Sequence, residues 1–493
     1  MAPRPTPPSF EKSRRVNISL SFAVCFMARP GSSCNLSTYL LVLMLLYMYL
    51  FAQAHWCQIE SPKAPDNSRS CPVMHVNQMD TMSTPSYKYA HAILLLVVFV
   101  DLLGFGILGP LIPFYVERLG ATTETITVII ALYSLTQFIA MPVWGYLSDR
   151  IGRRPVLAIS MAGHALSYVI MAYADSLWMM AFARIVGGVT SANLATAYAY
   201  MADTTDNKNR AKGLGRISAA FGLGFVLGPV IGGFLAGGDS VESANFMLPA
   251  FVAAGLSVLS FAGILLFLPE SRPAAKKGDG AQKRPGFLTM LKLALGRPLI
   301  AMITGLCFLV ITFVAMRESI LPLWGHYLHG LSPVDIGILL SVSGGTVTLF
   351  QLIAIGPLTA RFGEVILVKT AIFFYAIGWT GLVLSDTLIQ MSSALCFTAV
   401  ATAMFQTCLQ SLLSQQAAAH ERGTIMAVYQ SSSSLARFSG QAMAGTAYGQ
   451  IGPNAPFTLG VVAMFPAMVL IYFIGNRIRG LLRTDTSEVR PQE

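Results

Sequence analysis

The stretch Gly145-Tyr-Leu-Ser-Asp-Arg-Ile-Gly-Arg-Arg-Pro155 decides how this chain folds. It lies between two apolar runs, 126–144 and 156–173, so it is a short connection between two spanning segments. Gly145 and Gly152 are expected to let the backbone turn, and Pro155 suits the first turn of the next helix. Its arginines hold the loop on the cytoplasmic side of a membrane: Arg150, Arg153 and Arg154. Anchoring alone requires neither Asp149 nor glycines at fixed spacing, so the pattern indicates a further role.

The composition is that of a polytopic membrane protein. Of 493 residues, 54% are hydrophobic and only 11% are charged, whereas a soluble chain carries about a quarter charged residues. The net charge of +10 does not indicate nucleic-acid binding, because the cations lie in short loops between apolar runs. The seven cysteines show no metal-ligand spacing, and no nucleophile–base motif is present. We therefore expect no metal, no cofactor and no enzymatic activity.

Twelve apolar runs are each about long enough to cross a bilayer as a helix. They are 93–115, 126–144, 156–173, 177–200, 217–235, 246–268, 299–324, 336–358, 366–384, 391–413, 425–448 and 457–474. The sequence thus predicts an all-α membrane protein of two six-helix bundles, 90–268 and 298–480. A cytoplasmic linker at 269–297 joins them, and a cytoplasmic tail follows at 481–493.

Residues 1–89 differ from the rest of the chain. They are mostly polar and proline-rich, as expected of disorder, with one apolar run at 39–52 that is short for a spanning helix. We expect a peripheral extension, or an over-long start with Met79 or Met82 as the true beginning. A thirteenth membrane segment stays open. In the twelve-helix unit the basic loops alternate with poorly charged ones, so both of its ends are expected to be cytoplasmic. For a bacterial source this membrane would be the inner (plasma) membrane.

An internal repeat supports the two halves. The pattern Gly145-x-Leu-x-x-Arg150-x-Gly152 recurs 211 residues later as Gly356-x-Leu-x-x-Arg361-x-Gly363. Duplicated halves are typical of transporters whose substrate site lies at the interface of the repeats. The second copy is degraded, since Ala360 replaces the aspartate, so we expect the N-terminal half to carry the coupling chemistry.

Asp101 is the first candidate for proton handling. It lies within the first apolar run, where a carboxylate costs about 2.5–3.5 kcal/mol unless it is paired, hydrated or protonated. Gly104, Gly106 and the following prolines are expected to bend the helix beside it. Arg184 of the fourth run has no acid nearby on its own helix, so we expect it to pair with Asp101. A purely structural ion pair is the alternative.

The fifth run carries a dense glycine pattern that indicates close helix packing. Its residues are Gly224, Gly228, Pro229, Gly232 and Gly233. Ordinary packing of small residues is the simplest explanation, but the full spacing G-x-x-x-G-P-x-x-G-G is much more specific.

Together these motifs resemble those of the major facilitator superfamily. The 145–155 loop resembles the connection between helices two and three of these transporters, and the fifth run resembles the antiporter motif of drug:proton exporters. The resemblance covers about 93–483 and is greatest to tetracycline efflux pumps. It implies that Asp101 and Arg184 couple to protons and that Asp149 and Arg153 latch the cytoplasmic side. Two departures separate the chain from those pumps: Ser167 stands where they have an acid, and no acid occurs at 370–384.

Polar residues inside other runs are candidates for a substrate cavity: Gln137, Gln351, Arg317 and Gln406. Each glutamine is as well suited to a hydrogen bond between neighbouring helices as to a cavity wall. For Arg317 the alternative is a pair with Glu318 near the outer end of its helix.

The expected function is proton-coupled efflux of amphipathic, tetracycline-like drugs by alternating access, in a monomer whose partners are the bilayer, a small solute and protons. The alternatives are a proton-coupled exporter of a sugar or other metabolite, and an uncoupled facilitator. A channel or a receptor is not favoured, because neither class of protein would need the duplicated loop motif.

Overall fold

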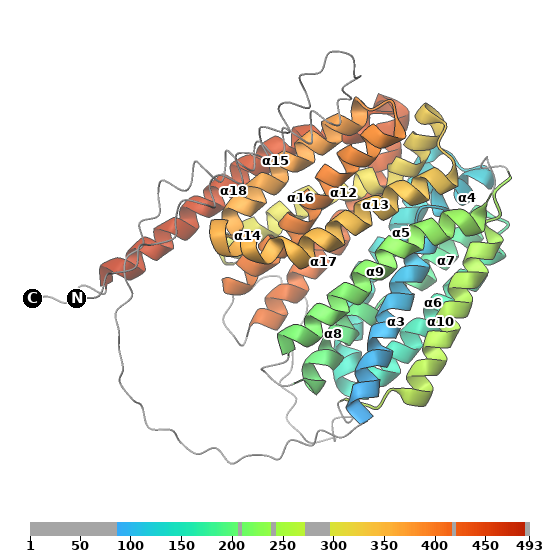
Figure 1. The fold of residues 1–493 in the computed structure, drawn as a ribbon, viewed down its shortest axis with the longest axis horizontal. Helices are drawn as coiled ribbons and strands as arrows, with labels where there is room; N and C mark the ends of the chain where they lie inside the picture. The colour runs from blue at the N-terminus through green and yellow to red at the C-terminus, as the bar shows by residue number, and fades with distance from the viewer. Residues whose placement is uncertain (1–85, 206–209, 238–242, 272–295, 417–420, 489–493) are drawn as a thin grey trace, which may run out of the picture. The chain divides into compact units, whose positions relative to one another are not determined.

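The computed structural model describes residues 86–205, 210–237, 243–271, 296–416 and 421–488. Within these ranges all regular structure is helical, which confirms the predicted fold class. The first half of the chain contributes α3 (Ser86–Leu108), α4 (Ile112–Arg118), α5 (Thr123–Ile151), α6 (Arg153–Ala172), α7 (Leu177–Val189), α8 (Asn193–Thr204), α9 (Arg210–Ala236) and α10 (Met247–Phe267). The second half contributes α12 (Pro298–His329), α13 (Pro333–Ile353), α14 (Ile355–Phe362), α15 (Glu364–Val383), α16 (Leu388–Gln415), α17 (Arg422–Thr446), η1 (Ala447–Ile451) and α18 (Ala455–Glu488) (Figure 1).

Ten helices in the described part of the chain are long and apolar enough to cross a membrane. The predicted fourth segment is not among them, because it is divided into α7 and α8 by a break at 190–192. The predicted eleventh segment is α17, which is 25 residues long but too polar to qualify, with a run of serines before Arg437. The count of twelve spanning helices therefore stays a prediction.

The first predicted segment is also broken, but not beside Asp101. The helix continues through Gly104 and Gly106 and ends at Leu108, and α4 begins at Ile112. Pro110 accounts for the break, because it has no N–H to donate to the preceding turn and its ring clashes there. The interruption predicted at Gly104 and Gly106 is therefore wrong, because both lie in regular helix, whereas the one predicted at the following prolines is present at Pro110.

The predicted domain boundaries coincide with helix ends in part. α10 ends at Phe267 and α12 begins at Pro298, so the predicted linker lies between them, although residues 272–295 are outside the described ranges. The predicted tail begins at 481, whereas α18 continues to Glu488. Most of the predicted extension, 1–85, is not described.

The two halves meet along two pairs of helices, α5 with α17 and α9 with α13. We call the end of the bundle where α5 joins α6 the basic end and the other the opposite end. From the opposite end inwards, the Gly445 N–H donates to Thr127 Oγ1 at 3.1 Å. Farther along, Ser134 donates to Gln441 at 2.8 Å.

The α9–α13 contact is formed largely by backbone. A Cβ on Gly233 would lie 2.9 Å from Pro333 O, and one on Gly337 would lie 2.5 Å from Pro229 O. Nearer the basic end, Gly215 of α9 and Gly356 of α14 have no atom within 4 Å of a Cβ position. The halves are therefore in close contact towards the opposite end and diverge towards the basic end, as α9 and α13 do in Figure 1.

Candidate functional site

The 145–155 loop turns at Gly152 alone. α5 continues through Gly145 to Ile151, so the turn predicted at Gly145 is wrong, whereas Pro155 does lie in the first turn of α6. Gly152 has φ +101°, a conformation that favours glycine. A Cβ on Gly152 would also lie 2.4 Å from the Glu270 carboxylate. Two independent constraints thus require glycine at this position.

Arg153 is the centre of an ion cluster at the basic end. Its side chain is buried and contacts Asp149 of α5 at 2.9 Å and Asp203 of α8 at 3.1 Å. It also donates to Ser148 Oγ at 2.8 Å. Asp203, next to the last residue of α8, is the second carboxylate of this cluster. The cluster ties α5, α6 and α8 together within the N-terminal half.

Glu270 completes this end of the bundle and was missed by sequence reasoning. Its carboxylate accepts the backbone N–H groups of Arg153 at 2.8 Å and Arg154 at 3.1 Å. These are unpaired donors at the N-terminus of α6, where the helix dipole also favours an anion. In return, Arg154 donates to the last carbonyls of α10, at Ile264 and Leu265. The signal in the sequence was a single acid, directly after the sixth apolar run.

Glu270→Gln is expected to destabilise the protein by about 0.5–2 kcal/mol, the usual range for losing a helix cap. The amide keeps one acceptor oxygen but loses the charge that the α6 N-terminus stabilises. A lower Tm in detergent would show the loss. Asp386→Asn is the matched control, because Asp386 is exposed in the loop before α16. Equal Tm values for both variants would contradict the capping role.

Asp101 is bonded to an unexpected partner, His164 of α6. Its Oδ1 lies 2.7 Å from His164 Nδ1, and its side chain is 12% exposed. His164 Nε2 lies 3.2 Å from the Gly187 carbonyl of α7. Sequence reasoning passed over His164, although a histidine inside an apolar span is itself a functional signal.

The predicted pairing of Arg184 with Asp101 is wrong, because no ion pair joins them although the structure describes both. Arg184 donates to the Ile130 carbonyl at 3.4 Å, and its guanidinium lies 4.6 Å from the centre of the Tyr133 ring. Its Nε has no hydrogen-bond partner. An aromatic face and a carbonyl stabilise this cation in place of the carboxylate.

The close packing predicted from the glycines of α9 is present. A Cβ on Gly228 would lie 2.6 Å from Gly106 Cα, and one on Gly232 would lie 2.2 Å from Ile107 O. A Cβ on Gly224 would lie 2.7 Å from Phe99 O. These three glycines bring α9 against α3, and the Pro229 ring also lies on this side, 3.2 Å from a Cβ position on Gly106. Gly233 and the Pro229 carbonyl face α13.

In the C-terminal half, Glu318 lies between two arginines. It is 3.5 Å from Arg317 on its own helix and 3.1 Å from Arg437 of α17. The expected pairing of Arg317 with Glu318 is therefore present, and the Arg317 side chain is buried, at 6% exposed. Its Nε and Nη1 have no hydrogen-bond partner. This half therefore presents a buried cation with unused donors.

The glutamines differ in their surroundings. Gln137 donates to Ser191 Oγ at 2.8 Å, so it bonds α5 to the break between α7 and α8. Gln351 and Gln406 are half-buried, and their place in a cavity stays a prediction.

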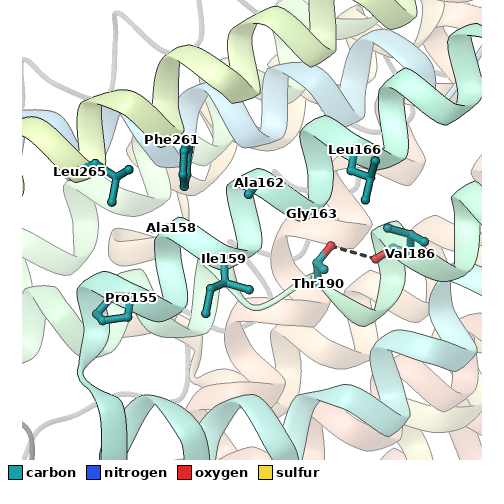
Figure 2. Close-up of a pocket in the computed structure, with 10 residues that line it drawn as sticks. All are labelled: Pro155, Ala158, Ile159, Ala162, Gly163, Leu166, Val186, Thr190, Phe261 and Leu265. Atoms are coloured by element: carbon teal, nitrogen blue, oxygen red, sulfur yellow. Dashed lines mark hydrogen bonds between the residues drawn. The ribbon is translucent and has the colours of Figure 1, made fainter.

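A separate apolar groove lies between α6, α7 and α10 (Figure 2). Its lining includes Ile159, Leu166 and Phe261, and no titratable side chain. The hydrogen bond drawn there is internal, from Thr190 Oγ1 to the Val186 carbonyl. Since the groove touches none of the charged residues above, we assign the chemistry to the bundle interior.

The chain matches the profile of the Major Facilitator Superfamily over residues 94–345 and 306–491. It is 30% identical to the class G tetracycline resistance protein of Vibrio anguillarum over 71% of this chain and 87% of that protein. It is 26% identical to multidrug resistance protein 2 of Bacillus subtilis (strain 168), over 79% and 94%. The crystal structure of the human organic anion transporter MFSD10 (TETRAN) superposes with a TM-score of 0.61 at 24% identity, covering 79% of this chain and all of that one, which is a likeness of fold.

Proposed function

Because the chain belongs to the Major Facilitator Superfamily, we propose that it is a proton-coupled exporter of amphipathic drugs. The relatives named for tetracycline and multidrug resistance support drug efflux as the general activity. In this proposal a proton enters the cell for each drug molecule that leaves. Inward movement of one positive charge releases about 2.3 kcal/mol per 100 mV of membrane potential, before any pH gradient is counted.

The observation that carries the proposal is Asp101. It is an acid inside an apolar helix, its side chain is 12% exposed, and it is hydrogen-bonded to an imidazole. Ionisable groups at such depth usually belong to ion pathways or proton relays. Arg153 and its two carboxylates form a separate cluster at the basic end, which suits a gating role.

Alternating access is supported by the way the halves meet. The basic end is cytoplasmic by its loop charges, so the observed divergence there corresponds to an inward-facing state. Export requires the reverse arrangement, with closure at the basic end. There the Asp149–Arg153 pair lies where it would contact helix ends of the other half and latch the outward-facing state.

A second candidate is a proton-coupled exporter of an acidic metabolite. The buried guanidinium of Arg317 favours it, because two of its donor nitrogens lack partners and would suit a carboxylate or phosphate. Ser167, where tetracycline pumps carry an acid, also separates the chain from those pumps.

The experiment is drug uptake into everted membrane vesicles with an acid interior. Tetracycline and a panel of cationic, neutral and anionic amphipathic dyes are added, and the internal pH and accumulated compound are followed together. We expect accumulation of at least one compound, coupled to loss of internal protons and prevented by a protonophore. Accumulation that survives collapse of both the pH gradient and the potential would contradict proton coupling. Selective uptake of anionic compounds would favour the second candidate.

A further inference from the structure

The position of His164 fixes how many protons the Asp101–His164 pair holds. Nε2 faces the Gly187 carbonyl, which has no hydrogen to give, so Nε2 carries one. Nδ1 then lies 2.7 Å from a carboxyl oxygen of Asp101. If Nδ1 carried no proton and the carboxylate were ionised, a lone pair on nitrogen would face a lone pair on oxygen at this distance, which is repulsive. One further proton must therefore lie in this bond, on either the nitrogen or the oxygen.

We propose that Asp101 and His164 together form the proton-binding site, and that the structure shows the proton-loaded form. This inference rests on the proposed function only for the use of the proton in transport. When the proton leaves, the carboxylate is ionised and Nδ1 keeps a free lone pair. The 2.7 Å contact between α3 and α6 must then lengthen, because nothing bridges the two acceptors.

Asn193 provides the replacement donor for Nδ1. Its Nδ2 already lies 3.4 Å from His164 Nδ1, and its side chain is 2% exposed. Its Oδ1 has no hydrogen-bond partner, so this amide is incompletely satisfied in the loaded form. A small rotation of the imidazole away from Asp101 would bring Nδ1 within ordinary hydrogen-bond distance of Nδ2. Asn193 is thus a positioning residue that stabilises the unloaded form.

The location of Asn193 connects the proton to the backbone. It is the first residue of α8, directly after the break at 190–192 that separates α7 from α8. Discontinuous helices are common at the coupling sites of secondary transporters. Loading and unloading would therefore transfer His164 between an acid on α3 and an amide at this break.

The groups that face the pair are few. Tyr133 of α5, Tyr168 of α6 and Arg184 of α7 are its ionisable neighbours. On α8, Asp203 is engaged in the Arg153 cluster, and the described charges of α9 lie in its first turns. α10 contains no charged residue. Arg184 acts on these two tyrosines, and its contacts are the Tyr133 ring and the Ile130 carbonyl rather than the pair itself.

The test is ¹⁵N NMR of the full chain labelled at histidine, without drug, with the His164 signals assigned by their loss in His164→Gln. As the pH is varied, the Nδ1 signal should change while Nε2 stays protonated. Asp101→Asn should abolish this change or displace its midpoint. Asn193→Leu should also displace the midpoint, because the unloaded form loses its donor.

Ser167→Ala is the matched control. It removes another buried hydrogen bond of α6, to the Ala183 carbonyl, one turn from His164, and should leave the midpoint unchanged. A Nδ1 signal that is constant with pH in the wild type, or that titrates identically in Asp101→Asn, would overturn the inference. Because no drug is present, that result would leave drug efflux itself untouched. Conversely, the vesicles could fail to transport drug while the Nδ1 signal still changes with pH. That result would contradict only the proposed function.

Discussion

Asp101→Asn is expected to reduce gradient-driven drug accumulation in everted vesicles at least about 100-fold, the scale on which a lost proton-transfer group acts. The amide has nearly the shape of the carboxyl group and can still bond His164, but it cannot bind and release a proton. Exchange of drug down its own concentration gradient should persist, because the substitution removes the proton-binding group and leaves the packing of both helix bundles unchanged. The measurement is uptake with and without a proton gradient, at matched protein levels.

Asp386→Asn serves as the control here too, since it removes a carboxylate that is exposed outside the bundle. Wild-type accumulation by Asp101→Asn would remove Asp101 from the coupling mechanism. Loss of both uphill and downhill transport would instead indicate a structural role for the Asp101–His164 contact.

Gly232→Ala is expected to have the largest effect on folding. The new methyl group would lie 2.2 Å from the Ile107 carbonyl oxygen, and backbone cannot rotate away as a side chain can. Overpacking of this kind costs about 1–3 kcal/mol or more. We expect low yield in the membrane and a clearly reduced Tm. In Gly228→Ala the new methyl group would lie 2.6 Å from Gly106 Cα, so this variant should show a smaller decrease in yield and Tm.

Gly263→Ala on α10 is the control, because a methyl group there meets no atom within 4 Å. It makes the same chemical change in another spanning helix of the same half and should leave Tm within error. A similar loss in Gly263→Ala and Gly232→Ala would indicate a general sensitivity of glycine in these helices. A stable Gly232→Ala would mean that α3 and α9 can separate at little cost.

The sequence predicted those features that depend on local pattern. The helices follow from apolar runs, the turn at Gly152 from a glycine next to charged residues, and the α3–α9 contact from glycine spacing. Each of these is encoded within a few consecutive turns of chain. The break at 109–111 follows from Pro110, as the prolines predicted. The break at 190–192 was missed, because Thr-Ser-Ala contains neither proline nor glycine and the run on either side is long enough for one helix.

The partners of charged groups were not predictable in the same way. Arg184 was assigned to Asp101 because a buried cation needs compensation, but Tyr133 and a carbonyl satisfy that need equally from another helix. His164 and Glu270 act through contacts 63 and 117 residues away in the chain. Such contacts depend on which helix faces are opposed, and no single-helix pattern records that.

α9 uses neighbouring faces of one glycine motif for two kinds of contact. Gly228 and Gly232 contact α3 within one half, whereas Gly233 and the Pro229 carbonyl meet α13 across the boundary between the halves. In the proposed rocking of the halves, the first contact would persist and the second would open. Substitution of Gly228 or Gly232 is then expected to destabilise the fold, and substitution of Gly233 to redistribute its conformations.

The α9–α13 contact is made largely of main chain, and this has an energetic consequence for the proposed rocking of the halves. Parting two backbones uncovers few large apolar side chains and frees few rotamers, so this contact would add little hydrophobic or entropic difference between the closed and open forms. A poised equilibrium of this kind responds to small inputs. Binding that prefers one form by a few kcal/mol, such as a single proton or one drug molecule, is enough to invert its population.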